Sequence, residues 1–314
     1  MQKIKKSERF VWIDIMLTLL AIEVMQYFYY GIRVVVLSGV CVFVSFVAEI
    51  VSLNLVNRDF TADDLTCISD ALIISLMLPA VIDFRIVAIA CVFAVIVVKN
   101  IFGGRDNMIF SPSAAAYIFM LVSWKNQVLM FTEPHVRTGI SEKAENLVSS
   151  ASHVFNTSGR MNYSDFEILM GNMRGAGGAV SILLLIVSAV ILILRRDISF
   201  GAFLGTIFGT AFLAYCIPVC RSKYDSVKYM LVSNMILFAA VYIISDKRIA
   251  PRKNYYAFFY GFFIATFSYI LLLKTEKENI IIIVSVLFTP VSLAFRNFEK
   301  NIEFSETEGV QGLE

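Results

Sequence analysis

The chain has 314 residues, of which 58% are hydrophobic and 17% are charged, and its formal net charge is +2. Long apolar runs recur along almost its full length, which predicts an all-α polytopic membrane protein and excludes an ordinary soluble domain. The sequence gives no reason to expect a nucleic-acid partner, because membrane topology alone accounts for the basic residues of the inner loops.

The apolar runs predict ten membrane spans. A helix needs about 20 apolar residues to cross roughly 30 Å of hydrocarbon, and irregular backbone exposed to lipid is too costly to tolerate. In chain order the expected spans cover approximately residues 11–29, 32–55, 65–82, 84–100, 109–124, 177–194, 200–219, 228–244, 255–273 and 279–295. The third and the fifth are short for a full crossing.

The distribution of Lys and Arg predicts how these spans are oriented. With a cytoplasmic N-terminus, 15 of the 27 basic residues lie inside and 12 lie outside. Five of those 12 belong to one long loop, residues 125–176, where the charge rule has little force, so the short loops divide 15 to 7. We therefore expect a multi-pass protein of the inner (cytoplasmic) membrane with both termini in the cytoplasm.

The long loop divides the ten spans into five and five. Because five is odd, two similar halves must insert with opposite topology, which is the inverted-repeat design of many transporters. We expect a first repeat over 1–124, an outer loop over 125–176, a second repeat over 177–297 and a cytoplasmic tail over 298–314. The alternative, that any ten-helix chain can be divided in this way, stays open.

Charged groups inside the spans are the next signal, because each costs about 2.5 to 3.5 kcal/mol at a helix centre. Asp14, Glu49 and Asp64 would lie toward the cytoplasmic ends of the first three spans, where they could attract a cation to an inner entrance. Simple hydration of these carboxylates explains them equally well. Glu23 and Asp70 are deeper, so each is expected to have a partner in the protein interior.

Catalysis by this chain alone finds little support. The only histidines, His135 and His153, lie in the long loop, and no Cys or carboxylate cluster around them has the spacing of metal ligands. The sequence also lacks the phosphate-binding pattern G-x-x-x-x-G-K-[ST]. We expect no metal site and no stand-alone catalyst.

Several motifs resemble those of one family of membrane proteins. The stretch KNIFGGRDNMIFSPSAAAYIFMLVSW (99–124) resembles the link between helices 4 and 5 of that family. Similar agreement is found in DLTCISDALIISLMLPA (64–80), LMGNMRGAGGAVS (169–181) and SDKRIAP (245–251), and Asp14 and Glu49 fall where the family has acids. The family comprises the RnfD component of the Rnf ion-translocating electron-transport complex and the NqrB component of the sodium-pumping NADH:quinone oxidoreductase. The resemblance covers roughly residues 5–297.

The resemblance implies a cofactor. Members of this family carry FMN, attached through its phosphate to a threonine in an outer-side motif that precedes a Gly-Asn pair. Residues 146–152 align with that motif, and Ser152 takes the threonine position, nineteen residues before Gly171. A serine hydroxyl can form the same phosphoester. The resemblance therefore implies covalent FMN on Ser152, above a loop shaped by Gly171, Asn172, Gly175 and Gly178.

The flavin motif departs from the family's pattern, since Asn146 replaces Asp, Ser150 replaces Gly and Ser152 replaces Thr. Losing the glycine matters if the backbone there must take a positive φ. Elsewhere polar positions of the family are exchanged, and Ser111 stands where the family has Asn. A second interpretation therefore stays open, in which the stretch is an ordinary solvated loop and the cofactor site is eroded.

Ser111 is also the predicted N-cap of the short helix that follows Gly103-Gly104, with Pro112 near its first position. This helix start and the start of the last span, near Asn279, would point positive dipole ends into the protein, which suits an anion or a flavin phosphate. Tight folding of the glycine loop is the competing explanation of the glycine motif.

Taken as implied by the resemblance, the chain is a membrane subunit of a redox-driven complex that translocates Na⁺ or H⁺ and passes electrons through flavin. Its partners would be other membrane subunits, including an iron–sulfur subunit and a second flavin subunit. The oxidoreductase activity would belong to the complex. A cofactor-free channel or transporter, or a structural subunit on the same scaffold, is the alternative.

Overall fold

The computed structural model describes residues 8–102, 108–136 and 147–311, and most of these residues are helical. The one extended pairing among them is an isolated bridge between Phe131 and Val148. The expectation of an all-α chain is therefore confirmed. Gly103-Gly104 and Asn146, which the sequence singles out, lie outside the described residues.

The first half contains α1 (Glu8–Tyr30), α2 (Ile32–Val56), η1 (Ala62–Leu65), α3 (Thr66–Leu76), α4 (Phe84–Val92) with its π-helical continuation η2 (Phe93–Ile101), α5 (Pro112–Ser123) and α6 (Lys125–Val128). Gly31, at φ +81°, allows α2 to begin directly after α1. The Asp83 carboxylate accepts a hydrogen bond of 2.9 Å from the Arg85 N–H and starts α4.

Between the halves lie α7 (Ala151–Ser158), α8 (Asp165–Met170) and α9 (Gly177–Val180). Ser164 and Glu167 form a reciprocal capping box at the start of α8, and Gly159 and Gly171 end α7 and α8 in the left-handed conformation. The predicted outer loop is thus partly helical, because it contains complete start and stop signals for short helices.

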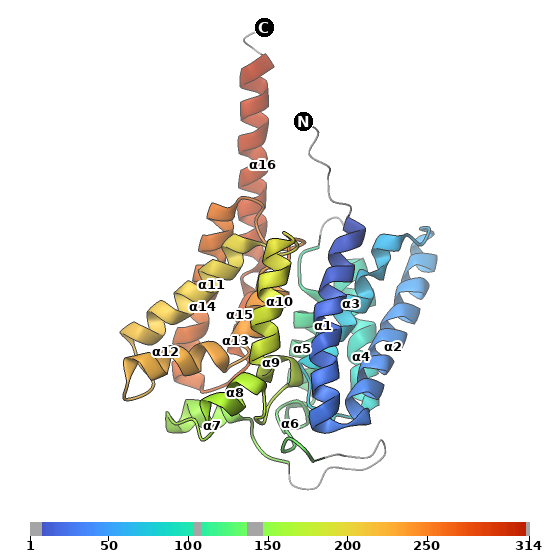
Figure 1. Cartoon of the computed structure of the whole chain (residues 1–314). Coiled ribbons are helices and arrows are strands. Elements are labelled where there is room, and N and C mark those ends of the chain that lie inside the picture. Colours follow the sequence, from blue (N-terminus) through green and yellow to red (C-terminus); the bar gives the residue numbers. More distant parts are fainter. Residues whose placement is uncertain (1–7, 103–107, 137–146, 312–314) are drawn as a thin grey trace.

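The second half contains α10 (Ile182–Leu194), α11 (Phe200–Cys216), α12 (Lys223–Val232), α13 (Ile236–Ala239), the π-helical η3 (Ala240–Ile244), α14 (Asn254–Thr275), α15 (Ile280–Leu287) and α16 (Thr289–Gln311). In Figure 1 the two halves stand side by side, and α1 begins on the same side of the molecule on which α16 ends. We call this the termini side; α7 and α8 lie on the opposite, far side.

Each of the ten expected spans contains an apolar helix, but the lengths differ. Among the described residues, four helices are long and apolar enough to cross a membrane, or up to six if each of two bent pairs counts as one span. The helices from Thr66, Pro112, Ile182 and Phe200 are apolar but shorter. The chain is therefore a multi-pass membrane protein, and ten complete crossings stay a prediction.

Three expected spans differ from the observed helices for local reasons. Ser181 separates α9 from α10 with φ −78° and ψ 63°. Asn234 and Met235, both left-handed at φ 57°, bend α12 against α13 by 56°. Past a 42° bend after α15, α16 runs on to Gln311, so it includes most of the predicted tail.

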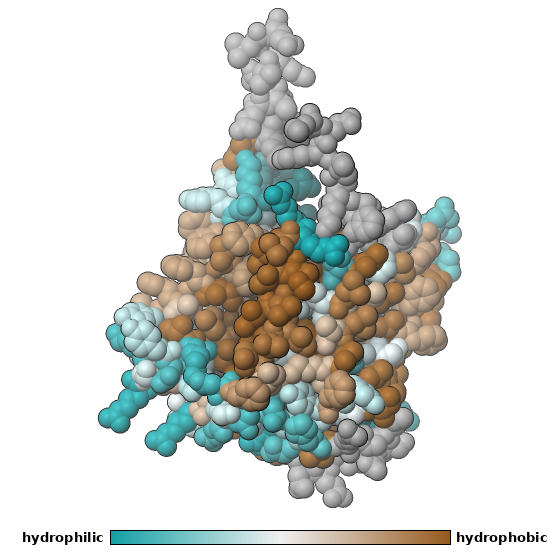
Figure 2. All heavy atoms as spheres, viewed as in Figure 1, coloured by the Kyte–Doolittle hydropathy of each residue, from teal (hydrophilic) through white to brown (hydrophobic). Residues whose placement is uncertain are grey.

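The outer surface matches a lipid environment. Figure 2 shows hydrophobic residues across the middle of one face, over α1 and α10, and hydrophilic residues gathered on the far side below them. Along α10 the exposed side chains are large and apolar, among them Ile186 at 47%, Val190 at 52% and Leu194 at 77%. Such a surface is stable only when it faces hydrocarbon or another subunit.

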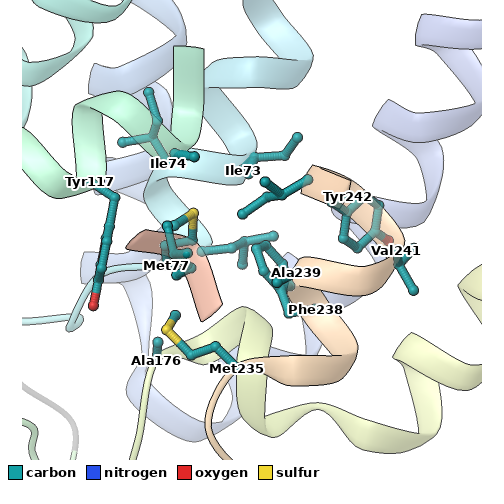
Figure 3. Close-up of a cluster of buried hydrophobic side chains, with 14 of the residues drawn as sticks. Ile73, Ile74, Met77, Tyr117, Ala176, Met235, Phe238, Ala239, Val241 and Tyr242 are labelled. Carbon is teal, nitrogen blue, oxygen red and sulfur yellow. The ribbon is translucent and has the colours of Figure 1, made fainter. Parts of the chain in front are cut away.

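The halves meet in a buried cluster of α3, α5 and the α13–η3 stretch, in which Ile73, Met77, Tyr117, Phe238 and Tyr242 gather (Figure 3). We call this boundary the seam. Because lipid tails are as apolar as these side chains, close packing rather than exclusion from water must hold the seam together.

The tightest helix pair lies within the second half, where α11 and α14 pack at small residues. A Cβ added at Gly205 would overlap the Phe258 carbonyl oxygen, and one added at Gly261 would overlap that of Ala202. Gly201 and Gly209 face the same helix at the same spacing of four residues. This is the small-residue packing that lets membrane helices approach closely.

Candidate functional site

The strongest polar contact across the seam joins Asp70 of α3 to Arg248, which lies between η3 and α14. The guanidinium donates two hydrogen bonds to the Asp70 carboxylate, at 2.6 and 3.0 Å, and another to Asp246 at 2.8 Å. Burial alone would lower the pKa of Arg248, but Asp246 and Asp70 raise it well above its ordinary value. Asp70 is 2% exposed, and the expectation that it has a partner in the protein is confirmed.

A second ion pair crosses the seam on the same side. Asp14 of α1, which is 5% exposed, lies 2.9 Å from the Arg195 guanidinium at the end of α10. The two pairs fasten α1 and α3 of the first half to the ends of α10 and η3 in the second half. Both therefore connect segments that a sequence pattern cannot place together.

Glu49 and Asp64 form a separate cluster inside the first half. Lys99, on η2 and only 1% exposed, donates to the Glu49 carboxylate at 2.8 Å and to the Asp64 carbonyl oxygen at 3.3 Å. Although burial opposes it, hydrogen bonds from Thr61 lower the pKa of Asp64 below its ordinary value, and Arg58 at 3.7 Å adds to the effect. Lys99 stands at the end of the expected span 84–100, and no local pattern predicts the buried carboxylate that it contacts.

Glu23 of α1 has hydrogen-bond partners but no basic partner among the described residues. Ser38 of α2 donates to its carboxylate at 2.6 Å and lies 3.0 Å from the Ser75 hydroxyl. One turn further, Gln26 donates to the Gly177 carbonyl and the Ser181 hydroxyl, each at 2.9 Å. Buried hydrogen bonds of Glu23 and Gln26 thus extend along α1 toward α9. The expectation that Glu23 has a partner in the protein interior is confirmed.

Ser152 occupies the second position of α7 and is half-buried. Its Oγ accepts a hydrogen bond of 3.1 Å from the Asn234 N–H, at the bend between α12 and α13. The Asn156 amide also donates to the Asn234 side-chain oxygen at 2.6 Å. The candidate attachment residue therefore supports two residues, Asn234 and Met235, whose left-handed backbone is otherwise unfavourable.

Ser150, which replaces a glycine of the family motif, is the N-cap of α7. Its Oγ accepts from the His153 N–H at 3.0 Å and donates to the buried carboxylate of Glu278. The backbone at Ser150 has φ −63°. The position thus needs no glycine in this chain, and the conformational concern raised by the substitution does not apply.

The glycine motif packs into the seam. A Cβ at Gly171, where φ is +77°, would lie 2.8 Å from the Val180 carbonyl oxygen, and one at Gly178 would lie 2.5 Å from the Phe238 ring and 3.0 Å from Leu76. Gly175 is equally close to Val180, at 2.7 Å. Gly178 requires glycine because the backbone there passes closely between α3 and α13, and Gly171 and Gly175 because the chain folds closely against the end of α9.

Backbone hydrogen bonds hold the start of α7 and Asn172 in place. The Asn172 N–H donates to the Glu167 carbonyl at 2.9 Å, and the N–H of Ala151, which precedes Ser152, donates to the Arg174 carbonyl at 2.9 Å. The structure thus places the start of α7 beside the glycine segment, and a flavin site shared by the two stays a prediction. It describes no side-chain bond from Asn172.

The two predicted half-helix starts are present. Ser111 caps α5, accepting from the Ala114 N–H at 3.4 Å, and Pro112 follows at the first helical position. Asn279 precedes α15 and is fully buried. Tyr117, in the second turn of α5, lies near Glu278 and Asn279. A side chain of α5 therefore reaches the start of α15, and a shared anion site at the two helix starts stays a prediction.

Comparison with known proteins decides the family. The profile described as the NQR2, RnfD, RnfE family matches residues 2–291. The chain belongs to this family. The resemblance inferred from the motifs is thereby confirmed over nearly the whole chain.

Three relatives from Shewanella are each named as the D subunit of an ion-translocating oxidoreductase complex. The protein from Shewanella frigidimarina (strain NCIMB 400) is 29% identical over 115 residues, 36% of this chain and 33% of that protein. Those from Shewanella piezotolerans (strain WP3 / JCM 13877) and Shewanella amazonensis (strain ATCC BAA-1098 / SB2B) are each 28% identical, over 35% and 44% of this chain and 32% and 40% of their own length. The similarity to these members of the NQR2, RnfD, RnfE family thus spans less than half of each relative.

Proposed function

We propose that this chain is the D-type membrane component of a redox-driven complex that translocates Na⁺ or H⁺, with the oxidoreductase activity belonging to the complex. The observation that carries the proposal is the family match over residues 2–291. The names of the Shewanella relatives support it. The partners proposed from the family are other membrane subunits, including an iron–sulfur subunit and a second flavin subunit.

We further propose that the chain crosses the inner membrane ten times, as two inverted five-helix repeats with the termini side in the cytoplasm. An apolar helix in each expected span supports this topology. It is also supported by the start of α1 and the end of α16 on one side of the molecule, as an even number of crossings requires (Figure 1).

The cytoplasmic entrance of the ion path is proposed to lie near Asp14, Glu49, Asp64 and Asp70. Their burial toward the termini side supports this assignment. Each acid already interacts with a basic side chain, so an entering cation must compete with Arg195, Lys99 or Arg248. Asparagine at position 70 is expected to slow ion uptake by proteoliposomes of the assembled complex, and unchanged uptake would remove Asp70 from the path.

Ser152 is the proposed attachment residue for FMN. Its Oγ fits a phosphoester in that an N–H donor, that of Asn234, already lies 3.1 Å from the atom that would carry the phosphate. Flavin bound here would supply one- and two-electron transfer. The chain's own contribution is to hold the start of α7 against the bend at Asn234 through Ser152 and Asn156.

Covalent flavin can be tested directly on the full chain co-expressed with a flavin transferase. We expect a fluorescent band in a denaturing gel for the wild type and none for Ser152→Ala. Ser149→Ala is the matched control, because it removes a neighbouring hydroxyl of the same stretch and should leave the band unchanged.

A colourless wild-type protein would contradict flavin attachment and favour the cofactor-free channel, transporter or structural subunit. A band that persists in Ser152→Ala would place the flavin on another residue. Purification of the native complex distinguishes the remaining alternatives, since a channel would be isolated without redox partners.

A further inference from the structure

A cavity of about 540 Å³ opens at the seam near the termini side. One wall is formed by the first half, with Trp12 of α1 and Thr66 of α3. The other wall belongs to the second half and includes Arg196, Arg252 and Arg296. A volume of this size accommodates a small organic ligand.

The cavity is strongly basic. Its lining holds Arg196, Lys247, Arg248, Arg252 and Arg296 against two carboxylates, Asp197 and Asp246. Arg248 is satisfied by Asp70 and Asp246. Within the described part of the chain, Arg196, Arg252 and Arg296 form no ion pair with a carboxylate. Three guanidinium groups therefore line one space without a carboxylate in ion-pair contact.

Two of these guanidinium groups repel each other. Arg252 and Arg296 are close enough to interact electrostatically, and the Glu299 and Asp246 carboxylates offset part of this repulsion at Arg296. Both residues are held in place, because the Arg252 N–H donates to the buried Glu299 carboxylate at 3.0 Å and the Arg296 side chain donates to the Arg248 carbonyl at 2.9 Å. An anion between the two groups would convert this repulsion into attraction.

An independent observation comes from the opposite wall. The Trp12 indole N–H and the Thr66 hydroxyl are both buried, and neither has a hydrogen-bond partner among the described residues. An indole nitrogen can only donate, and a buried donor without an acceptor is costly. Both side chains line the cavity, but the two polar atoms are covered, so each group must turn toward the cavity to meet an acceptor placed in it.

We propose that this cavity binds a phosphate group, with Arg252 and Arg296 supplying charge and Trp12 and Thr66 supplying hydrogen bonds from the facing wall. Guanidinium groups match phosphate oxygens geometrically, and a tetrahedral anion accepts bonds from several directions at once. Ile15, Ile73 and Tyr242 leave an apolar part for the organic group that carries the phosphate. The inference does not depend on flavin or on ion transport.

The phosphate has two sources with the same chemistry, a soluble phosphate ester and the headgroup of an anionic phospholipid. The soluble arm uses the delipidated full chain in neutral detergent and follows thermal unfolding with inorganic phosphate or AMP, against chloride at equal ionic strength. The lipid arm uses nanodiscs of phosphatidylcholine with or without phosphatidylglycerol, and counts retained phosphatidylglycerol by native mass spectrometry.

In the arm that shows binding, we expect Arg252→Gln/Arg296→Gln to weaken it at least about tenfold, because two charge-assisted contacts are lost. Trp12→Phe keeps an aromatic side chain and removes the N–H together with the pyrrole part of the indole, so a loss of roughly three- to tenfold is expected without loss of the fold. Arg58→Gln is the control, since it also removes a guanidinium charge, but from a residue close to α2 that does not line the cavity.

Saturable binding of a phosphate ligand that Arg58→Gln leaves intact and the cavity variants weaken supports the proposal, and the responding arm identifies the source. An equal loss in Arg58→Gln would indicate general surface attraction and would overturn it. So would the absence of saturable binding in both arms, or binding that neither the double variant nor Trp12→Phe changes.

Discussion

Arg248 shows how one side chain can hold two halves of a membrane protein together. It is 24% exposed on the termini side, yet its guanidinium reaches the nearly fully buried Asp70 and also Asp246. A buried carboxylate without a partner would be strongly unfavourable in this environment. The main role of the contact is therefore to fix the position of α3 relative to the end of η3.

Replacing Asp70 tests this role. Asp70→Asn removes the charge of a bidentate pair, and we expect the free energy of unfolding to fall by roughly 1 to 3 kcal/mol, less than for a fully buried pair because Arg248 keeps Asp246 and some solvent. Unfolding in detergent followed by tryptophan fluorescence measures the change. Asp165→Asn, which breaks an exposed pair with Lys228, should have little effect, and equal effects would contradict the assignment.

Glu278 is the residue whose titration should be visible near neutral pH. Burial raises its pKa from 4.5 to about 7, although the hydrogen bond from Ser150 opposes the shift. The folded chain therefore disfavours the charged carboxylate. The neutral Glu278 carboxyl therefore stabilises the folded chain fully below about pH 4.5. This stabilisation, about 3 kcal/mol, is lost as the pH rises to 7.

Glu278→Gln stays neutral at every pH and can still accept from Ser150. We expect it to match the wild type in thermal stability at pH 4.5 and to exceed it at pH 8. Glu276→Gln is the control, because Glu276 is exposed and lies two residues away. A variant less stable than the wild type at pH 8 would show that the charged form of Glu278 is favoured in the folded chain.

At the scale of elements, the pairing of α11 with α14 depends on the absence of side chains. Gly205→Ala would place a methyl group against the Phe258 carbonyl oxygen and force the helices apart, at roughly 1 to 3 kcal/mol of stability. Gly39→Ala in α2 meets nothing within 4 Å and should be neutral or slightly stabilising. Thermal unfolding of both variants in the same detergent checks the difference, and two equal shifts would refute close packing as the cause.

The elements could be predicted from sequence where their causes are local. Apolar run length located a helix in each of the ten expected spans, and the Ser111-Pro112 pair identified the start of α5. The bend at Asn234 was missed because its left-handed backbone is supported by Ser152, 82 residues earlier in the chain. The partner of Asp70 was missed for the same reason, since Arg248 is 178 residues away.

The candidate site was predictable only as a set of residue types. The motif pointed to Ser152 and to the glycines, but it did not indicate that Gly178 is required by Phe238 and Leu76. Nor did it indicate that Ser150 binds Glu278, which comes 128 residues later. Contacts between distant segments depend on how the helices pack, and no local pattern carries that information.

At the scale of the whole molecule, the ion pairs across the seam lie toward the termini side, and the far side is covered by α7 and α8 (Figure 1). The proposed orientation makes these two sides the cytoplasmic and the outer surface. Arg58 lies just beyond the end of α2, on the termini side, and Ser158 is the last residue of α7, on the far side. Both side chains are exposed.

Cysteine labelling tests the orientation. In a background with Cys216 and Cys220 replaced by alanine, we expect Ser158→Cys to react with a membrane-impermeant maleimide in intact spheroplasts. Arg58→Cys should react only after permeabilisation. The opposite pattern would invert the proposed topology, and labelling of both residues in intact cells would place the two sides on one surface of the membrane.

The hydrogen bond between Ser152 and Asn234 connects the far side to the centre of the molecule. Phe238 follows Asn234 by four residues along α13 and touches the position of Gly178. Any group that takes the place of that bond withdraws support from a strained stretch of backbone, and the change reaches Phe238 and Tyr242 through one short helical segment. We therefore expect the closure of the two bundles on each other to respond to a chemical change at the half-buried Ser152 hydroxyl.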